Sequence, residues 1–407
     1  MAAVEAIVDL NAIAHNVGVL RQRSGTGMMA VVKADGHGHG AVPVAEAALR
    51  AGAAEIGVAT VAEALALRES GITAPVIAWL HTPTTDFTAA IRGSVEVVVS
   101  STRQLSAVSA AADALGRTVI VGVKIDTGLG RSGAGANEWP QLRDALADHT
   151  ASEAIVLRTA MTHLACGDQP AHPLNTKQAD RFDACVAELE SAGIAPQVTH
   201  ISNSAAALTR RDLSRDLVRA GIAVYGRTPV PEMGEFGLIF ATTLTAEIAQ
   251  IKRLSAGQGV SYNHTWLSSR DTTVAVIACG YADGVPRVAS NRLAVWCNGR
   301  RYRNVGRVCM DQFVIDLGPH GAGVREGDRV VLFGSGAHGE PTAREWAQLA
   351  DTIDYEILTA VRGRRVRRYL PDDRLPLPQC QRATVDGWGY DCHVVPVGFP
   401  RNGGHPR

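Results

Sequence analysis

The hydrophobic pattern from the N-terminus to about residue 226 alternates short apolar runs with longer segments whose apolar residues recur at helical spacing. This alternation of strand and helix indicates a parallel sheet, and eight or more units in about 225 residues favour a closed (β/α)8 barrel over an open sheet. Nine strands are predicted, but a (β/α)8 barrel has eight. We therefore expect one of them, with the first as the candidate, to pair outside the barrel. The predicted strands are 6–10, 29–33, 56–59, 76–80, 95–99, 119–125, 155–163, 198–201 and 217–224, and the predicted helices are 42–49, 62–69, 104–115 and 177–191.

The pattern changes after Pro229, where strand-like segments are separated by glycine-rich turns instead of helices. This change predicts three parts, which are a barrel over 1–232, a mainly β domain over 233–370 and an irregular extension over 371–407 without a clear period. The predicted strands of the second part are 240–251, 273–278, 293–297, 308–317 and 329–333, followed by a helix over 343–358.

The composition of the 407-residue chain is that of a globular protein, with 46% hydrophobic and 20% charged residues. Forty basic residues balance forty acidic ones, so no net positive field attracts nucleic acid or an anionic membrane, and a small-molecule partner is expected. No run approaches the roughly 20 apolar residues of a membrane span, and Glu5 and Asp9 interrupt the N-terminal segment, which favours a cytoplasmic protein. The seven cysteines lack metal-ligand spacing, so we expect reduced thiols and no metal site.

Lys33 ends the apolar run 28–32 and is followed directly by the glycine-rich segment 34–40. A lysine at the end of a buried strand is partly desolvated, which favours its neutral amine and makes it a nucleophile toward an aldehyde. A strand-end lysine also commonly extends its ammonium to water, so this residue alone does not decide between the two interpretations.

Four further predicted strands of the barrel end in polar residues, at the edge where barrel enzymes gather their catalytic groups. Together with the strand-end lysine they predict a cationic rim rich in hydrogen-bond donors, which suits an anionic ligand carrying an aldehyde. These strand ends contribute Lys124, Arg131, His163, Ser204 and Arg219.

The loops that contain Ser204 and the pair Gly221 and Ile222 follow the last two predicted strands of the barrel. Barrels commonly hold a phosphate at this place with backbone N–H groups and a hydroxyl. A phosphate together with an imine-forming lysine points to pyridoxal 5'-phosphate, which acts as an electron sink for a carbanion.

Six motifs, in this order, resemble those of the alanine racemase family, the pyridoxal-phosphate enzymes of fold type III, over about residues 4 to 369. The resemblance implies that the protein interconverts L- and D-alanine. The motifs are Ala-Val-Val-Lys-Ala-Asp at 30–35, Lys-Ile-Asp-Thr-Gly-Leu-Gly-Arg at 124–131, Thr-His-Leu-Ala-Cys at 162–166, His-Ile-Ser-Asn-Ser-Ala-Ala at 200–206, Gly-Tyr-Ala-Asp-Gly at 280–284 and Val-Gly-Arg-Val-Cys-Met-Asp-Gln at 305–312.

Two opposed acid–base groups are implied by this resemblance, Lys33, which also binds the cofactor aldehyde, and Tyr281 of the partner subunit. Racemisation needs a base on each face of Cα, because one base that returns its proton to the same face regenerates the starting enantiomer. Met310 of the partner subunit is implied to bind the substrate carboxylate through its main-chain N–H. Such a site requires a homodimer whose active sites are shared between chains.

Four residues of the barrel resemble the family's residues around the cofactor ring and the substrate. Arg219 resembles the residue that faces the pyridine nitrogen, and because a guanidinium keeps its proton, that nitrogen would stay unprotonated. His163 resembles a residue packed against the ring, and Arg131 resembles the binder of the substrate carboxylate. Lys124 resembles a lysine that many members carry as a carbamate, whose negative charge would orient Arg131.

The cofactor phosphate is the implied ligand of a further set of residues. His37 stands where the family commonly has a tyrosine that touches the phosphate, and we expect the charge of this imidazole to vary near neutral pH. The other residues implied at the phosphate are Asn203, Ser204, Gly221, Ile222 and Tyr355.

Two departures from the family pattern, Ala220 and Trp266, leave open a racemase of another amino acid such as serine. A decarboxylase of basic amino acids on the same architecture is a less favoured alternative, because the second domain has no Glu-Pro-Gly-Arg-type phosphate motif. A non-catalytic pyridoxal-phosphate-binding protein is a third alternative, but such proteins are single barrels.

Overall fold

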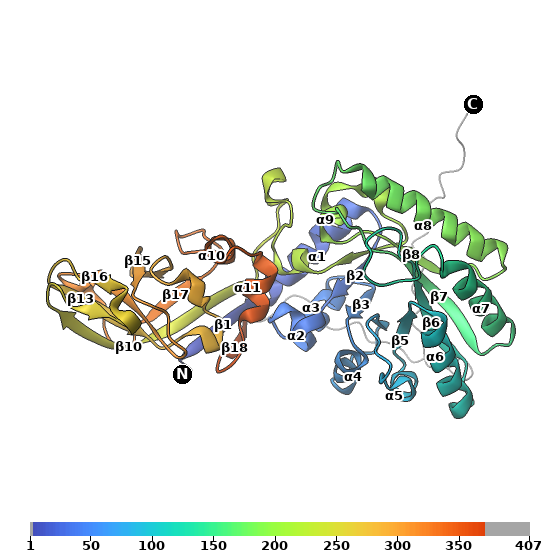
Figure 1. The fold of residues 1–407 in the computed structure, drawn as a ribbon, viewed down its shortest axis with the longest axis horizontal. Helices are drawn as coiled ribbons and strands as arrows, with labels where there is room; N and C mark the ends of the chain where they lie inside the picture. Colours follow the sequence, from blue (N-terminus) through green and yellow to red (C-terminus); the bar gives the residue numbers. More distant parts are fainter. Residues whose placement is uncertain (1–2, 371–407) are drawn as a thin grey trace. The chain divides into compact units, whose positions relative to one another are not determined.

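The computed structural model describes residues 3–370, and the predicted extension over 371–407 lies outside the described residues. Two eight-stranded sheets dominate the described part, one parallel and one mostly antiparallel (Figure 1). No helix in this part has the length and apolar character needed to span a bilayer.

The parallel sheet is a closed barrel, whose strands neighbour one another in the order β8-β7-β6-β5-β4-β3-β2-β9. The two ends of this order meet, because the Asp216 N–H donates to the Thr199 carbonyl at 3.1 Å. The Arg219 N–H likewise donates to the Ser202 carbonyl at 2.9 Å. The (β/α)8 barrel predicted from the sequence is therefore confirmed. The strands are β2 (Gly27–Val31), β3 (Glu55–Val58), β4 (Val76–Ala78), β5 (Glu96–Val99), β6 (Val119–Lys124), β7 (Ile155–Met161), β8 (Val198–His200) and β9 (Leu217–Ala220).

Burial on both faces explains why most of these strands are continuous apolar runs, since helices cover the outside of the barrel and side chains fill its inside. Every residue of β3, β4 and β5 is buried. Inside the barrel, Met29, Ile77, Val98 and Met161 form one cluster in which no residue is more than 2% exposed. The barrel interior is thus a packed core that can support a site at its rim.

The helices of the barrel lie outside its strands (Figure 1). The four helices predicted from periodicity are confirmed as α3, α4, α6 and α8, whereas α1, α5, α7 and α9 were not predicted. Two of the missed helices, α5 and α9, have six residues, which is too short to show a helical period. The helices are α1 (Leu10–Ser24), α3 (Ala41–Arg50), α4 (Val61–Glu69), α5 (Phe87–Arg92), α6 (Thr102–Leu115), α7 (Trp139–Ala151), α8 (Pro173–Ser191) and α9 (Ser204–Thr209), whereas the short element α2 (Lys33–His37) contains left-handed residues.

The second sheet includes the first strand of the chain, β1 (Val4–Asp9), between β10 (Thr242–Leu254) and β18 (Val366–Leu370). β1 pairs antiparallel with β10 and parallel with β18. The expectation that the first predicted strand pairs outside the barrel is therefore confirmed. The sheet also contains β13 (Thr272–Ile277), β14 (Ala294–Cys297), β15 (Arg300–Val305), β16 (Phe313–Gly318) and β17 (Arg329–Phe333), and β11 (Gly259–Val260) and β12 (Trp266–Leu267) form a separate pair.

Two predicted elements of the second domain differ from the observed ones. β16 covers only the second half of the strand predicted over 308–317, because 308–312 form a loop instead. The helix predicted over 343–358 is two helices, α10 (Ala343–Ala350) and α11 (Asp354–Ala360). The first of them ends before Asp351, whose φ of 53° is left-handed and cannot continue an α-helix.

Candidate active site

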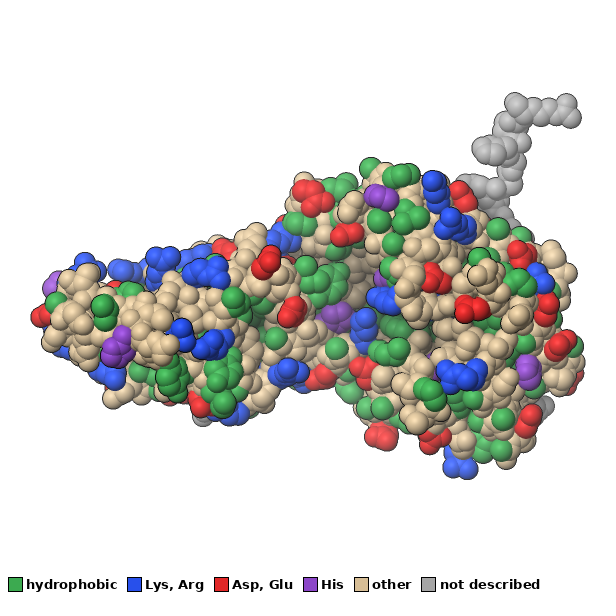
Figure 2. Space-filling model, viewed as in Figure 1, with side chains coloured by type: hydrophobic (Ala, Val, Ile, Leu, Met, Phe, Trp, Pro, Cys, Tyr) green, Lys and Arg blue, Asp and Glu red, His purple; other side chains and the backbone are tan. Residues whose placement is uncertain are grey.

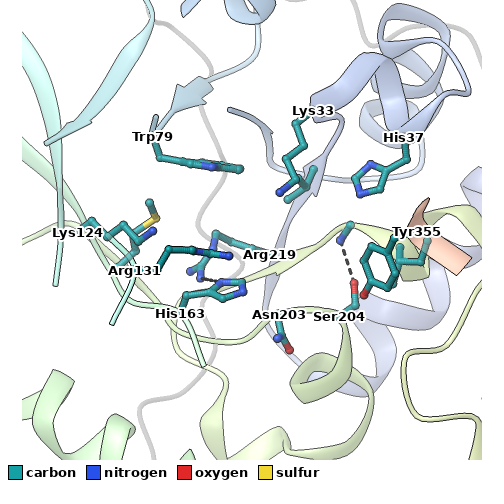
Figure 3. A pocket seen from close by; sticks show the side chains of 14 residues that line it. Lys33, His37, Trp79, Lys124, Arg131, His163, Asn203, Ser204, Arg219 and Tyr355 are labelled. Atoms are coloured by element: carbon teal, nitrogen blue, oxygen red, sulfur yellow. Dashed lines mark hydrogen bonds between the residues drawn. The ribbon is translucent and has the colours of Figure 1, made fainter. Parts of the chain in front are cut away.

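A pocket of about 270 Å³ lies at the carboxyl ends of the barrel strands. Figure 2 shows a hollow with Lys, Arg and His side chains at its surface, and Figure 3 shows how the lining side chains point toward one another. The pocket is lined by Val31, Lys33, His37, Trp79, Lys124, Arg131, Met161, His163, Asn203, Ser204, Arg219, Gly221, Ile222 and Tyr355.

The lining of this pocket is cationic. Lys33, Lys124, Arg131 and Arg219 contribute positive groups, and none of the lining residues, all within 3–370, is Asp or Glu. Like charges gathered in a concave site attract an anion and lower one another's proton affinity. The arrangement thus fits a ligand with negative groups such as a phosphate and a carboxylate.

Lys33 follows β2 and points into the pocket (Figure 3). Its side chain is open to the pocket, but the surrounding protein removes much of the water around the amine. This burial, followed by the positive charge of Arg131, lowers the pKa of Lys33, while the carboxylate of Glu63 partly offsets the effect. The neutral amine is therefore favoured, as nucleophilic attack on an aldehyde requires.

The turn after Lys33 has an uncommon left-handed backbone. Ala34, Asp35 and His37 have φ values of 53°, 53° and 51°. Each non-glycine residue in this conformation costs about 1–2 kcal/mol, so other contacts must stabilise the turn. One such contact comes from Glu63, whose carboxylate accepts the Ala34 N–H at 2.7 Å.

Arg219 is held by a set of buried acceptors. Its Nη1 donates to Nδ1 of His200 at 2.6 Å and to the His200 carbonyl at 2.8 Å. Its Nη2 donates to the carbonyls of Thr162 and Ile201 and lies 3.4 Å from Nδ1 of His163. Burial lowers the pKa of Arg219 to about 10, so the group stays charged at neutral pH. The guanidinium is thereby fixed as a cation at the pocket wall.

Lys124 and Arg131 lie at the opposite side of the pocket from His37 and Tyr355 (Figure 3). The Lys124 amine donates to the Ser132 hydroxyl at 2.6 Å. Burial, followed by the charges of Arg219 and Arg131, lowers the pKa of Lys124 to about 8. A substantial fraction of this amine is therefore neutral near physiological pH.

Ser204, Gly221 and His37 form the end of the pocket expected to hold a phosphate. The Ser204 hydroxyl accepts the Gly221 N–H at 3.0 Å, and a Cβ added at Gly221 would lie 3.3 Å from Nε2 of His37. Asn203 caps α9 by accepting the Ala206 N–H at 3.1 Å. The backbone thus approaches this end of the pocket closely, with hydroxyl, imidazole and N–H groups gathered there.

The environment of His37 bears on the expectation that its charge varies near neutral pH. Burial, followed by the charges of His39 and Lys33, lowers the pKa of His37 to about 3. Without a phosphate beside it the ring is therefore neutral near pH 7, and a charge that varies with pH stays a prediction for the phosphate-bound site, because a neighbouring anion raises the pKa of an imidazole. Burial likewise raises the pKa of the Tyr355 hydroxyl, which stays protonated and can donate.

Tyr281 and Met310 are the two predicted site residues that do not line this pocket. They lie in the second domain, where 42% of Tyr281 and 53% of Met310 is exposed. Their loops contact each other, because the Tyr281 N–H donates to the Cys309 carbonyl and the Ala282 N–H to the Met310 carbonyl, both at 3.0 Å. The structure therefore brings these two residues together on one exposed surface but not into the pocket of their own chain.

Three lining residues, Val31, Trp79 and Met161, were not predicted from the sequence. Trp79 follows β4 directly, so an aromatic residue just after an apolar run was the available signal. Among residues 3–370, no group of three His, Cys, Asp or Glu side chains is placed to hold a metal ion.

Two family models match most of the chain. The N-terminal domain of alanine racemase matches residues 8–229, and the C-terminal domain of alanine racemase matches residues 241–369. The alanine racemase of Mycolicibacterium vanbaalenii is 55% identical over 366 residues, which are 90% of this chain and 94% of that protein. The alanine racemase of Mycolicibacterium smegmatis is 53% identical over 372 residues, which are 91% of this chain and 96% of that protein.

Solved structures agree with these matches. The alanine racemase of the D-cycloserine producer Streptomyces lavendulae is similar at a TM-score of 0.88 and 44% identity, covering 91% of this chain and 98% of that one. The alanine racemase of Streptomyces coelicolor has the same TM-score at 43% identity, covering 90% and 98% of the two chains. By sequence and by fold alike, the chain belongs to the alanine racemase family.

Proposed function

We propose that the protein interconverts L- and D-alanine with pyridoxal 5'-phosphate as its cofactor. The observation that carries this proposal is the cationic pocket in which the amine of Lys33 has a lowered pKa, in a chain of the alanine racemase family. Its relatives at 53–55% identity are named alanine racemases.

The residues of the pocket fit this cofactor. The Lys33 amine would hold its aldehyde, and the phosphate would take donors from Ser204, Gly221 and Ile222, with His37 and Tyr355 beside it. Nδ1 of His37 is buried without a hydrogen-bond partner, so this ring has a nitrogen that is available for a further hydrogen bond. Arg219 would face the pyridine nitrogen and His163 the ring. When bound, the cofactor supplies an electron sink that stabilises negative charge at Cα.

The chain's own groups would then move the proton at Cα. Lys33 would remove or deliver it on one face, and Tyr281 of a partner subunit would do so on the other. The separation of Tyr281 from the pocket of its own chain supports this arrangement, because an exposed tyrosine in the second domain is free to serve another subunit. We therefore propose a homodimer with shared sites, in which 1–232 form the barrel and 233–370 the domain that serves the partner.

Substrate binding would rest on Arg131, whose planar fork can pair with both oxygens of the alanine carboxylate. The partner's Met310 would add a main-chain N–H. The neutral Lys124 amine can react with carbon dioxide, forming an N–C bond and releasing one proton, to give a carbamate. That anion would lie among the pocket cations and orient Arg131.

The test is a chiral assay of the purified, cofactor-loaded protein with a panel of amino acids. We expect racemisation of alanine with a higher kcat/KM than for serine or larger amino acids. A higher kcat/KM for serine than for alanine would indicate that the protein is a serine racemase instead. Release of carbon dioxide without racemisation would indicate a decarboxylase, and bound cofactor without turnover of any amino acid a non-catalytic binding protein. A cytoplasmic location stays a prediction from the sequence.

A further inference from the structure

The two loops that carry the proposed acid–base groups both contact one segment of the chain. The first is the left-handed turn that follows Lys33, and the second is the turn Tyr281–Asp283. Between them runs the segment from Leu358 at the end of α11 to Tyr369 in β18. We define this stretch, 358–369, as the connecting segment.

The connecting segment holds the Lys33 turn through two side chains of β18 and through Arg365, which precedes that strand. Arg367 donates through Nε to the Gly38 carbonyl at 3.0 Å and through Nη2 to the carboxylate of Asp35. Arg365 donates to the same Gly38 carbonyl at 3.3 Å. The Tyr369 hydroxyl donates to the His39 carbonyl at 3.1 Å. These contacts give the strained turn the external support that its backbone requires.

The same segment holds the Tyr281 turn through Arg364. Its Nε and Nη2 donate to the two carboxylate oxygens of Asp283, at 3.2 and 2.9 Å. Asp283 is 1% exposed and also accepts the Gly280 N–H at 3.1 Å, so it is an internal part of the turn. The remaining nitrogen of Arg364 lies 2.8 Å from the carboxylate of Asp311, beside Met310.

The backbone of both turns packs closely against the backbone of the connecting segment. A Cβ at Gly38 would lie 2.5 Å from the Leu358 carbonyl oxygen. A Cβ at Gly284 would lie 2.6 Å from the Ala360 carbonyl oxygen, and one at Gly363 would lie 2.6 Å from the Ala282 carbonyl oxygen. Neither turn can shift toward this segment without displacing backbone.

From this placement we infer that Arg364 and Arg367 are positioning residues, which tie the Tyr281 turn and the Lys33 turn to the same connecting segment. The inference rests on the proposed function, in which these turns carry the two acid–base groups. Because Tyr281 would act in the partner's site, the connecting segment would join the two active sites of the dimer. Each arginine holds the turn of a different proton-transfer group, so when cofactor and alanine are both saturating, loss of either one should slow exchange mainly on one face of Cα.

This asymmetry can be measured as exchange of the Cα hydrogen with deuterated water, followed separately for L- and D-alanine in the cofactor-loaded protein. Tyr281→Phe first identifies the enantiomer whose exchange needs the tyrosine. Arg364→Ala should slow exchange of that same enantiomer by about tenfold or more, and Arg367→Ala that of the other, since misplacement by about 1 Å can cost about 10²-fold in rate. Arg364→Lys and Arg367→Lys keep the charge without the fork and should recover part of the rate.

Arg368 provides a matched control on the same strand, because it pairs with Glu5 at 2.8 Å and contacts neither turn. Arg368→Ala should leave both exchange rates within about twofold of the parent. Equal slowing of both enantiomers by each arginine variant, or no slowing at all, would overturn the inference. An unchanged racemisation rate in Tyr281→Phe would instead overturn the proposed two-base function, so the two failures are distinguishable.

Discussion

The guanidinium of Arg219 donates a hydrogen bond of 2.6 Å to Nδ1 of His200. A guanidinium has no acceptor atom, so Nδ1 of His200 must be unprotonated and the ring carries its hydrogen on Nε2. Burial, followed by the charges of Arg219 and Arg158, holds the pKa of His200 well below its usual range, which agrees with a neutral ring. The neutral ring of His200 therefore accepts a hydrogen bond from Arg219 and helps to fix the orientation of its guanidinium.

Arg219→Lys should destabilise the barrel and weaken cofactor binding. The guanidinium serves the carbonyls of Thr162 and Ile201 as well as His200, and one ammonium cannot reach them all. Each buried carbonyl left without a donor costs about 1–3 kcal/mol in the free energy of unfolding, which urea denaturation measures. Arg215→Lys is the control, because its partner Asp183 is half exposed, and it should cost less than about 1 kcal/mol. Equal losses in the two variants would contradict the prediction.

Lys124→Gln should raise the KM for alanine more than it lowers kcat, because the proposed carbamate orients the carboxylate binder Arg131. The pKa of Lys124 is lowered to about 8, so the neutral amine that captures carbon dioxide increases as the pH rises from 7 to 9. Carbon-13 NMR with labelled bicarbonate should therefore show a carbamate signal that grows over this range and is absent from Lys124→Gln. A parent protein without this signal at every pH would rule out the carbamate.

The pocket could be predicted from the sequence to a large extent, because parallel barrel strands place their carboxyl ends on one rim. Polar residues at the ends of apolar runs, such as Lys33 and His163, therefore converge although they are far apart in the chain. Trp79 was missed because an aromatic residue after an apolar run resembles a continuation of the core.

The left-handed turn after Lys33 could not be predicted, since aspartate adopts this conformation occasionally but Ala34, which has no polar side chain, has no local reason to adopt it. Its support comes from Arg367 and Tyr369, more than 300 positions away in the chain. No local pattern contains that contact. The burial of His37 could not be predicted for a similar reason, because it depends on tertiary neighbours such as Tyr225, whose ring centroid lies 4.7 Å away.

Glu63→Gln should lower the pKa of Lys33 further, because the Glu63 carboxylate raises that pKa against the effect of burial. A lower pKa increases the neutral amine at a given pH, so the pH at which cofactor attaches at half its maximal rate should move to a lower value. The absorbance of the attached cofactor, followed after mixing the cofactor-free protein with pyridoxal phosphate, measures this shift. Glu69→Gln, an exposed residue of the same helix, is the control and should leave the profile in place. A shift toward higher pH would contradict the assigned sign.

Acid should destabilise the protein partly through His39, which is stacked on Tyr225 at 4.5 Å and fully enclosed. Burial lowers its pKa from 6.5 to about 4. Between these values the unfolded chain binds a proton that the folded chain does not, so the free energy of unfolding decreases as the pH falls below 6.5.

At pH 5 this contribution amounts to about 2 kcal/mol relative to neutral pH, at about 1.4 kcal/mol per unit. Urea unfolding of the parent, His39→Gln and the exposed-residue control His320→Gln, each at pH 7.5 and 5.0, isolates it. The His39 variant should lose less stability on acidification than the other two, because glutamine does not titrate. Identical losses in all three proteins would show that the acid sensitivity arises elsewhere, for example at the equally buried ring of His200.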